Sequence, residues 1–212
     1  MKSSLLRKRF TGTAVADMLR AAGGGAFIGS VTLAICVLDY LAYLRPLDPK
    51  NDKNGRADYI QIIRDFLVRI DQRYVPTDLY AVRCSLVHAY APSKAMKDAG
   101  LDNVGMAYCA PADHLRREGG SLLLNIDTFL ADVAWASHEF FDATDGSAIV
   151  EARGNQLLLR HSTRTGRIAG YDEDAENEAL EYGQMHPALR EFDSDSPSID
   201  RLRQDVSALF EE

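Results

Sequence analysis

The sequence predicts a mainly α-helical domain, a bundle of about four long helices with a small β-ribbon insertion. Apolar side chains recur at helical spacing in several long segments, and a stretch rich in glycine, proline and polar residues interrupts them between Pro92 and Gly120. With 212 residues, 46% of them hydrophobic, the chain is long enough to bury one sizeable core. We expect a helical domain at 26–170, between a basic segment with a short helix at 1–25 and an acidic loop with a C-terminal helix at 171–212.

The first predicted helix is short, from Thr13 to Ala22, and glycines 23–25 end it because glycine tolerates the dihedrals of a helix cap. The next runs from Ala26 to Leu44 with apolar side chains on all sides, which is typical of a buried central helix. One of its stripes contains Ile28, Ile35, Asp39 and Ala42, so we expect the Asp39 carboxylate to lie inside the fold. A buried carboxylate needs a partner.

The stretch from Ala26 to Leu44 is also about as long as a bilayer-spanning helix, which leaves a membrane-anchored protein as an alternative. Asp39 counts against this alternative because an ionisable residue in a span costs about 2.5 to 3.5 kcal/mol. We therefore expect a buried helix and no membrane partner.

Two further helices follow. The segment from Arg56 to Asp71 has the spacing of an amphipathic bundle helix. Residues 76–78, Pro-Thr-Asp, are a helix start signal, and a third long helix follows them. Its predicted core stripe contains Leu79, Val82, Leu86 and Tyr90.

The rest of the chain has weaker patterns. Short apolar runs at Val104–Cys109 and Ser121–Ile126 are expected to pair as a β-ribbon. A fourth long helix is predicted from Asp127 to Asp142. The segment Ile149–His161 fits a helix or a hairpin turned at Gly154 and Asn155, and we favour the helix. A short helix is expected to begin at Ser196, which is a good N-cap residue.

Charge and cysteine content restrict the function. A net charge of −7 does not favour tight, sequence-independent binding to duplex nucleic acid, although it leaves room for a small RNA site. The three cysteines, Cys36, Cys84 and Cys109, are widely spaced without a CxxC motif, which argues against a disulfide framework or a zinc site. We expect a cytoplasmic protein without a cofactor.

The third long helix carries the one chemically suggestive element, an Arg-x4-His pair. On a helical wheel Arg83 lies at the edge of the core stripe and His88 lies nearly opposite that stripe. The small residues Ala81, Cys84 and Ser85 share the face of His88. We interpret this face as a second contact surface at a homodimer axis.

Residues 79–88, Leu-Tyr-Ala-Val-Arg-Cys-Ser-Leu-Val-His, resemble the Arg-x(4 to 6)-His signature of the HEPN superfamily. The resemblance covers about 26–142. It implies a helical bundle that dimerises, and many members that carry the motif are metal-independent ribonucleases, whereas others are non-catalytic binding modules. Many active members have Asn, Asp or His directly after the arginine, where this chain has Cys84. A module that binds a protein partner is therefore the alternative to an enzyme.

The residue types suit RNA cleavage without a metal. The reaction needs a base for the 2′-hydroxyl proton, an acid for the leaving oxygen and positive charge beside the phosphate. Our hypothesis is a homodimeric endoribonuclease of single-stranded RNA in which His88 transfers protons and Arg83 stabilises the phosphate. The expected supporting residues are Asp39, Cys84, Ser85 and Tyr90. The structural alternative for Arg83 is a salt bridge to Asp39, which is compatible with a phosphate-binding role.

A metal site has little support in the sequence. His138 and Asp142 stand four residues apart, a usable ligand spacing, and Glu139 adjoins them, but no second His or Cys pair completes a site. We interpret these residues as the polar face of a helix.

Overall fold

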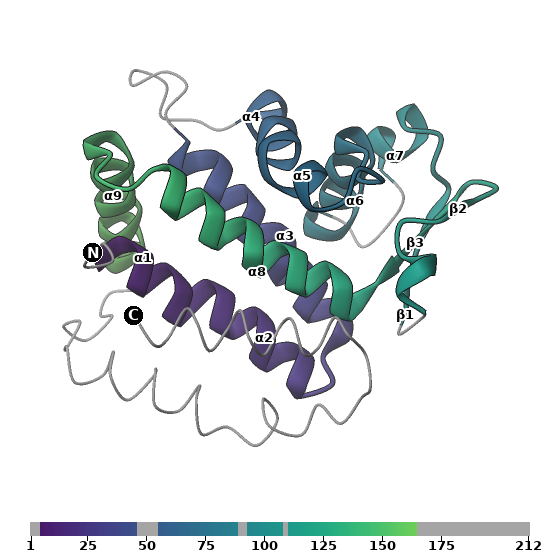
Figure 1. The fold of residues 1–212 in the computed structure, drawn as a ribbon, viewed down its shortest axis with the longest axis horizontal. Coiled ribbons are helices and arrows are strands. Elements are labelled where there is room, and N and C mark those ends of the chain that lie inside the picture. Colours follow the sequence, from purple (N-terminus) through teal and green to yellow (C-terminus); the bar gives the residue numbers. More distant parts are fainter. Residues whose placement is uncertain (1–4, 46–54, 89–92, 108–109, 165–212) are drawn as a thin grey trace.

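The fold is built around one central helix, α3 (Phe27–Leu44) (Figure 1). The computed structural model describes residues 5–45, 55–88, 93–107 and 110–164. Helix α3 contacts α2 (Ala16–Gly23), α4 (Arg56–Ile62), α6 (Pro76–His88), α8 (Ile126–Ala143) and α9 (Ala148–Arg164). A small sheet lies at the end of the bundle away from α9. The predicted mainly helical fold with a small β insertion is confirmed.

The N-terminal helix is longer than the sequence predicted. It comprises α1 (Leu5–Phe10), the π-helical turn η1 (Thr11–Val15) and α2 in one continuous run. Leu6 and Phe10 are buried, and the exposed Lys8 lies between them, so the basic segment is the outer face of a helix that enters the core. Gly25, at φ +78°, adopts the left-handed conformation that favours glycine and separates α2 from α3.

The helix predicted from Arg56 to Asp71 is observed as a continuous run of α4, the π-helical turn η2 (Ile63–Leu67) and α5 (Val68–Ile70). Its start is capped by Asp58, whose carboxylate accepts a hydrogen bond from the Gly55 backbone N–H at 2.8 Å. Helix α6 then begins at Pro76, as predicted, because proline is tolerated in a first helical turn.

The insertion after α6 contains the short helix α7 (Lys94–Asp98) and a three-stranded sheet. The predicted pairing is confirmed between β1 (Asn103–Ala107) and β3 (Ser121–Asn125), and the two strands are parallel. Strand β2 (Arg117–Glu118) pairs antiparallel with the other edge of β3. The 3₁₀ turn η3 (Pro111–Asp113) lies on the connection between β1 and β2.

The last two described helices also match the sequence. Helix α8 follows β3 directly, and Asn125 caps it by accepting a hydrogen bond from the Thr128 N–H at 2.9 Å. Helix α9 spans the segment for which a helix and a hairpin were both compatible with the sequence, so the helix is confirmed.

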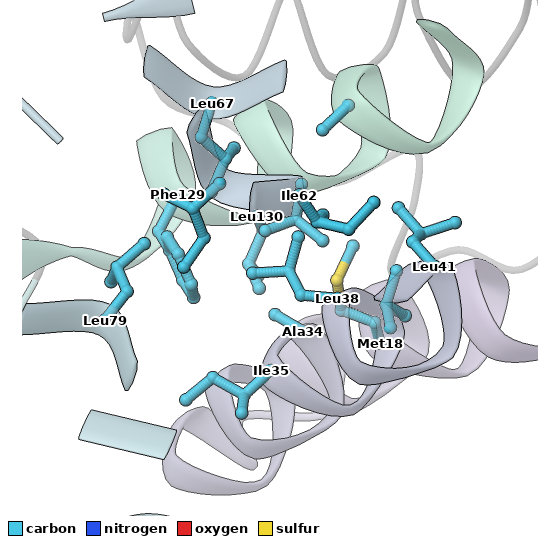
Figure 2. Packing of buried hydrophobic residues seen from close by; sticks show 14 of the residues in the cluster. Met18, Ala34, Ile35, Leu38, Leu41, Ile62, Leu67, Leu79, Phe129 and Leu130 are labelled. Atoms are coloured by element: carbon cyan, nitrogen blue, oxygen red, sulfur yellow. The ribbon is translucent and has the colours of Figure 1, made fainter. Parts of the chain in front are cut away.

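The core gathers on α3. Figure 2 shows Ala34, Ile35, Leu38 and Leu41 of this helix among Met18, Ile62, Leu67, Leu79, Phe129 and Leu130 from the surrounding helices. Helix α3 also has the length and apolar composition of a membrane span, and half of it is buried inside the fold. The core helix of a soluble protein passes the same test.

One part of the predicted inward stripe of α3 is wrong. Ile28 is 52% exposed, whereas Ser30 and Val31 just after it are fully buried, so the start of α3 packs into the core by a different side. The acidic loop, the helix predicted from Ser196, and Tyr90 lie outside the described residues.

Candidate functional site

An ion pair between α3 and α6 forms the centre of the candidate site. The Nε of Arg83 donates to Oδ2 of Asp39 at 2.9 Å and lies 3.3 Å from Oδ1. The two side chains are 22% and 21% exposed, so the pair lies at the edge of the core. The predicted contact between Asp39 and Arg83 is therefore confirmed, although the carboxylate is half-buried rather than fully enclosed.

Burial of the neighbouring side chains places Arg83 at this edge. Leu79 and Val82 of α6 are 1% and 0% exposed, as the predicted stripe requires, and Leu86 is 8% exposed. Arg83 follows Val82 and is therefore carried just outside the stripe. Ile35 on α3 is fully buried, and Asp39, one turn later, reaches the same edge from the other side.

Arg83 stays cationic at this position. Burial lowers the pKa of its guanidinium, but the Asp39 carboxylate and a hydrogen bond with Cys84 together raise it by more, so the pKa is higher than that of an ordinary arginine. The guanidinium thus stays protonated, and the Asp39 carboxylate contacts it on its Nε side.

Two thiols and two phenols adjoin the pair. Burial raises the pKa of the Cys36 thiol, Asp39 raises it further, and Arg83 lowers it. A hydrogen bond with Cys84 raises the pKa of Tyr80. Tyr59 is 2% exposed, its hydroxyl has no hydrogen-bond partner within the described chain, and burial raises its pKa well above the ordinary value. Cys36 and Cys84 are both free thiols.

The motif lies on the open side of α6. Tyr80, Arg83 and Cys84 are half-buried and Val87 is 37% exposed. On a helical wheel with 100° per residue, these four positions lie within one arc that begins at Arg83. The backbone position of His88 lies about 140° from Arg83, just beyond Cys84. Arg83 therefore begins the open arc, Cys84 lies on it, and the position of His88 falls between Cys84 and the fully buried Ala81 on the helical wheel. The structure describes the backbone of His88.

The predicted dimer surface of small residues is wrong. Ala81 is 0% exposed and Ser85 is 7% exposed within a single chain, so both face the chain's own interior. The sequence suggested no helix in the segment that follows the motif, whereas the structure has α7 there, in contact with α6. Cys84 lies on the open arc and remains at the candidate site.

A buried polar network that the sequence did not reveal lies between the start of α6 and α8. The Asn125 N–H donates to Nδ1 of His114 at 3.1 Å, so the proton of the neutral ring is on Nε2, which lies 3.0 Å from the Tyr74 hydroxyl. That hydroxyl donates to Asp132 at 2.9 Å. Burial, followed by the charge of Arg73, lowers the pKa of His114 to about 4.

This network is structural. His114 is 0% exposed and Asp132 is 2% exposed, so substrate cannot reach either group. The partners of His114 are 40 and 11 residues away in sequence, and no local pattern signals such a contact. An ion pair also joins the sheet to α6, because Arg117 of β2 pairs with the buried Asp78 at 2.8 Å. Together these contacts hold the insertion against the start of the motif helix.

His138 and Asp142, four residues apart on α8, form a polar cluster with Arg7. His138 is hydrogen-bonded to Arg7 of α1, and its Nε2 lies 3.2 Å from Asp142. Arg7 also donates to Asp142 at 2.6 Å. The described residues contain no group of three or more His, Cys, Asp or Glu side chains placed to hold a metal ion.

Comparison of this chain with known proteins found no match. Neither the models of known protein families, nor the curated proteins, nor the solved structures match this chain.

Proposed function

We propose that this chain is a HEPN-like, metal-independent endoribonuclease that cleaves single-stranded RNA as a homodimer. The observation that supports the proposal is the Arg83–Asp39 pair at one end of the open arc of α6, with the backbone position of His88 just beyond the other end. A guanidinium held through its Nε has a fixed plane, and a fixed plane suits phosphate oxygens. Histidine titrates in the range that proton transfer needs.

The proposed reaction is a transfer within the RNA strand. One His88 takes the proton of a 2′-hydroxyl, whose oxygen attacks the adjacent phosphorus. The bond from phosphorus to the 5′-oxygen breaks, and the second protomer's His88 protonates that oxygen. Arg83 stabilises the charge that develops on the phosphate oxygens. The products are a 2′,3′-cyclic phosphate and a free 5′-hydroxyl.

The homodimer in this proposal forms across the open arc of α6. Val87, at 37% exposure, is an apolar side chain on that arc. Contact between two such arcs brings two copies of the Arg-x4-His pair to one cleft. Val87→Asp should therefore give a folded monomer in light scattering, whereas Val75→Asp, at another exposed valine (45%), should leave the dimer intact.

One observation favours the non-catalytic alternative. The charge of Arg83 is already matched by Asp39, as in a purely structural ion pair. In that case the same helices bind a protein partner and the chain has no nuclease activity.

RNA cleavage in excess EDTA separates the two functions. The wild-type chain should cut single-stranded RNA and leave 2′,3′-cyclic phosphate ends. His88→Ala should slow cleavage by about 10²- to 10⁴-fold, the usual effect of losing a general acid–base group. Lys97→Ala, at an exposed position of α7, is the control and should cleave normally. Undiminished cleavage by His88→Ala would contradict the proposal.

A further inference from the structure

A cation–aromatic pair adjoins Arg83 on the same surface. The guanidinium carbon of Arg56 lies 5.2 Å from the centroid of the Tyr80 ring. Tyr80 is half-buried and Arg56 is exposed. The Tyr59 ring packs against Tyr80 at 6.1 Å and 63°, so the Tyr80 ring is supported from within the fold. The pair therefore presents an aromatic ring that is supported from within the fold, with an exposed cation over it.

Within the described residues, no carboxylate pairs with Arg56. Within the described chain Arg56 forms no ion pair, whereas Arg7, Arg20, Arg45, Arg73, Arg83, Arg116 and Arg117 all do. The nearby Asp58 caps the Gly55 N–H at 2.8 Å. Arg56 is thus available to a ligand that offers a π-face or a negative charge.

The spacing relates this pair to the motif. Tyr80 and Arg83 stand three residues apart on α6, which puts their Cβ atoms about 5–6 Å from each other. Arg56 and Arg83 both act on the Tyr80 phenol, since the charge of each lowers its pKa. A phosphate at Arg83 and the base of an adjoining nucleotide at Tyr80 are compatible with this separation.

We infer that Tyr80 and Arg56 form a nucleobase-binding subsite, in which a base of single-stranded RNA takes the place of the Arg56 guanidinium on the Tyr80 ring and Arg56 moves outward to cover the other face of the base. The inference rests on the proposed function, because it places the base beside the phosphate held at Arg83. Bases commonly stack on aromatic rings and guanidinium planes when they are unpaired. A base in a duplex is stacked on its neighbours, so this subsite selects single strands.

The test measures binding without cleavage. The probe is a 5′-labelled octamer, of adenosine or of uridine, with every 2′-hydroxyl methylated, which removes the nucleophile. Fluorescence anisotropy gives its affinity for the 212-residue chain. An abasic octamer with the same phosphates distinguishes base stacking from phosphate binding.

The variants separate the contribution of the Tyr80 ring to octamer binding from that of the Arg56 charge. Tyr80→Ala should weaken octamer binding by roughly 5- to 100-fold, the range for one stacked base, and Tyr80→Phe should bind as the wild type does. Arg56→Ala should weaken binding as well. Arg64→Ala, at another exposed arginine of the same helical run, should have no effect. The wild type should bind the abasic octamer at least about 10-fold more weakly.

Several results would overturn the subsite: wild-type chain that does not bind the octamer, equal affinity for the abasic octamer, or a folded Tyr80→Ala variant with wild-type affinity. If Tyr80→Ala does not fold, the exposed Arg56→Ala variant decides. Octamer binding by a chain that leaves unmodified RNA uncut would contradict the nuclease and keep the subsite. If the folded Tyr80→Ala variant cleaves RNA at the wild-type rate, the subsite is contradicted and the nuclease is kept.

Discussion

Arg83 and Asp39 are joined by a 2.9 Å hydrogen bond from Nε to Oδ2, across 44 positions of sequence. Each side chain is about one-fifth exposed, which places the pair between the surface and the buried classes of ion pair. Breaking a fully buried pair is strongly destabilising because it leaves a charge without compensation, whereas an exposed pair contributes little. The pair therefore has to be removed as a unit before any role of Arg83 in binding or catalysis can be measured.

Asp39→Ala should lower the free energy of unfolding by about 1–3 kcal/mol, since it removes the carboxylate from a half-buried guanidinium. The double variant Asp39→Ala/Arg83→Ala should lose less than the sum of the two single variants. Urea denaturation gives all of these values. Asp17→Ala, which breaks the more exposed pair with Arg20, is the control and should cost less than about 1 kcal/mol. Strict additivity of the two single changes would show that the pair contributes nothing.

Asp127→Asn should stabilise the protein at pH 8. Asp127 is 7% exposed in the first turn of α8, and burial raises the pKa of its carboxyl to about 6 from 3.8. Above pH 6 the folded state therefore carries the full cost of a buried carboxylate, and below about pH 4 that cost disappears. The attraction of a helix N-terminus for negative charge offsets part of it, so we expect a gain of about 2 kcal/mol at pH 8 that vanishes at pH 4. An equal gain at both pH values would contradict this explanation.

His114 should give the opposite pH dependence. Its pKa is about 4 in the folded chain and 6.5 ordinarily, so the unfolded state takes up a proton first as the pH falls. In an Asp127→Asn background, the free energy of unfolding should fall by about 3 kcal/mol between pH 6.5 and pH 4. Adding His114→Gln should flatten this slope. A slope that survives the second substitution would assign the effect to other groups.

Gly154→Ala should destabilise the contact between α9 and α1. A methyl group at position 154 would overlap both Cδ atoms of Leu6, and overpacking of this kind costs about 1–3 kcal/mol. In a Leu6→Ala background the overlap is gone, so the same substitution should be neutral or should stabilise the helix by up to about 1 kcal/mol. The measurement is urea denaturation of the four chains. Equal costs in both backgrounds would show that α9 does not pack against Leu6.

The long helices could be predicted because their apolar spacing repeats over many residues, as at Leu79, Val82 and Leu86. The contact between Asp39 and Arg83 could be predicted because Asp39 interrupts the apolar stripe of its helix and Arg83 lies at the edge of the stripe on α6. The helical wheel also assigned Ala81 and Ser85 to a free face, and this was wrong, since a wheel shows the phase of a residue but does not show which element covers it.

The remaining features depend on contacts between distant segments. The hydrogen bonds of His114 come from Tyr74 and Asn125, and the Arg56–Tyr80 pair joins two helices. None of these contacts has a period that one sequence displays. The parallel pairing of β1 with β3 likewise depends on how the insertion packs as a whole.

The most direct test of the account is the single-turnover rate of RNA cleavage in EDTA by the double variant Asp39→Ala/Arg83→Ala. This variant removes the proposed phosphate-binding charge together with its carboxylate partner, so neither charge is left buried without the other. Circular dichroism and light scattering should show a folded dimer. We predict cleavage about 10²- to 10³-fold slower than that of the wild type, as expected for loss of a group that stabilises the transition-state charge. A folded double variant that cleaves RNA at the wild-type rate would contradict the account.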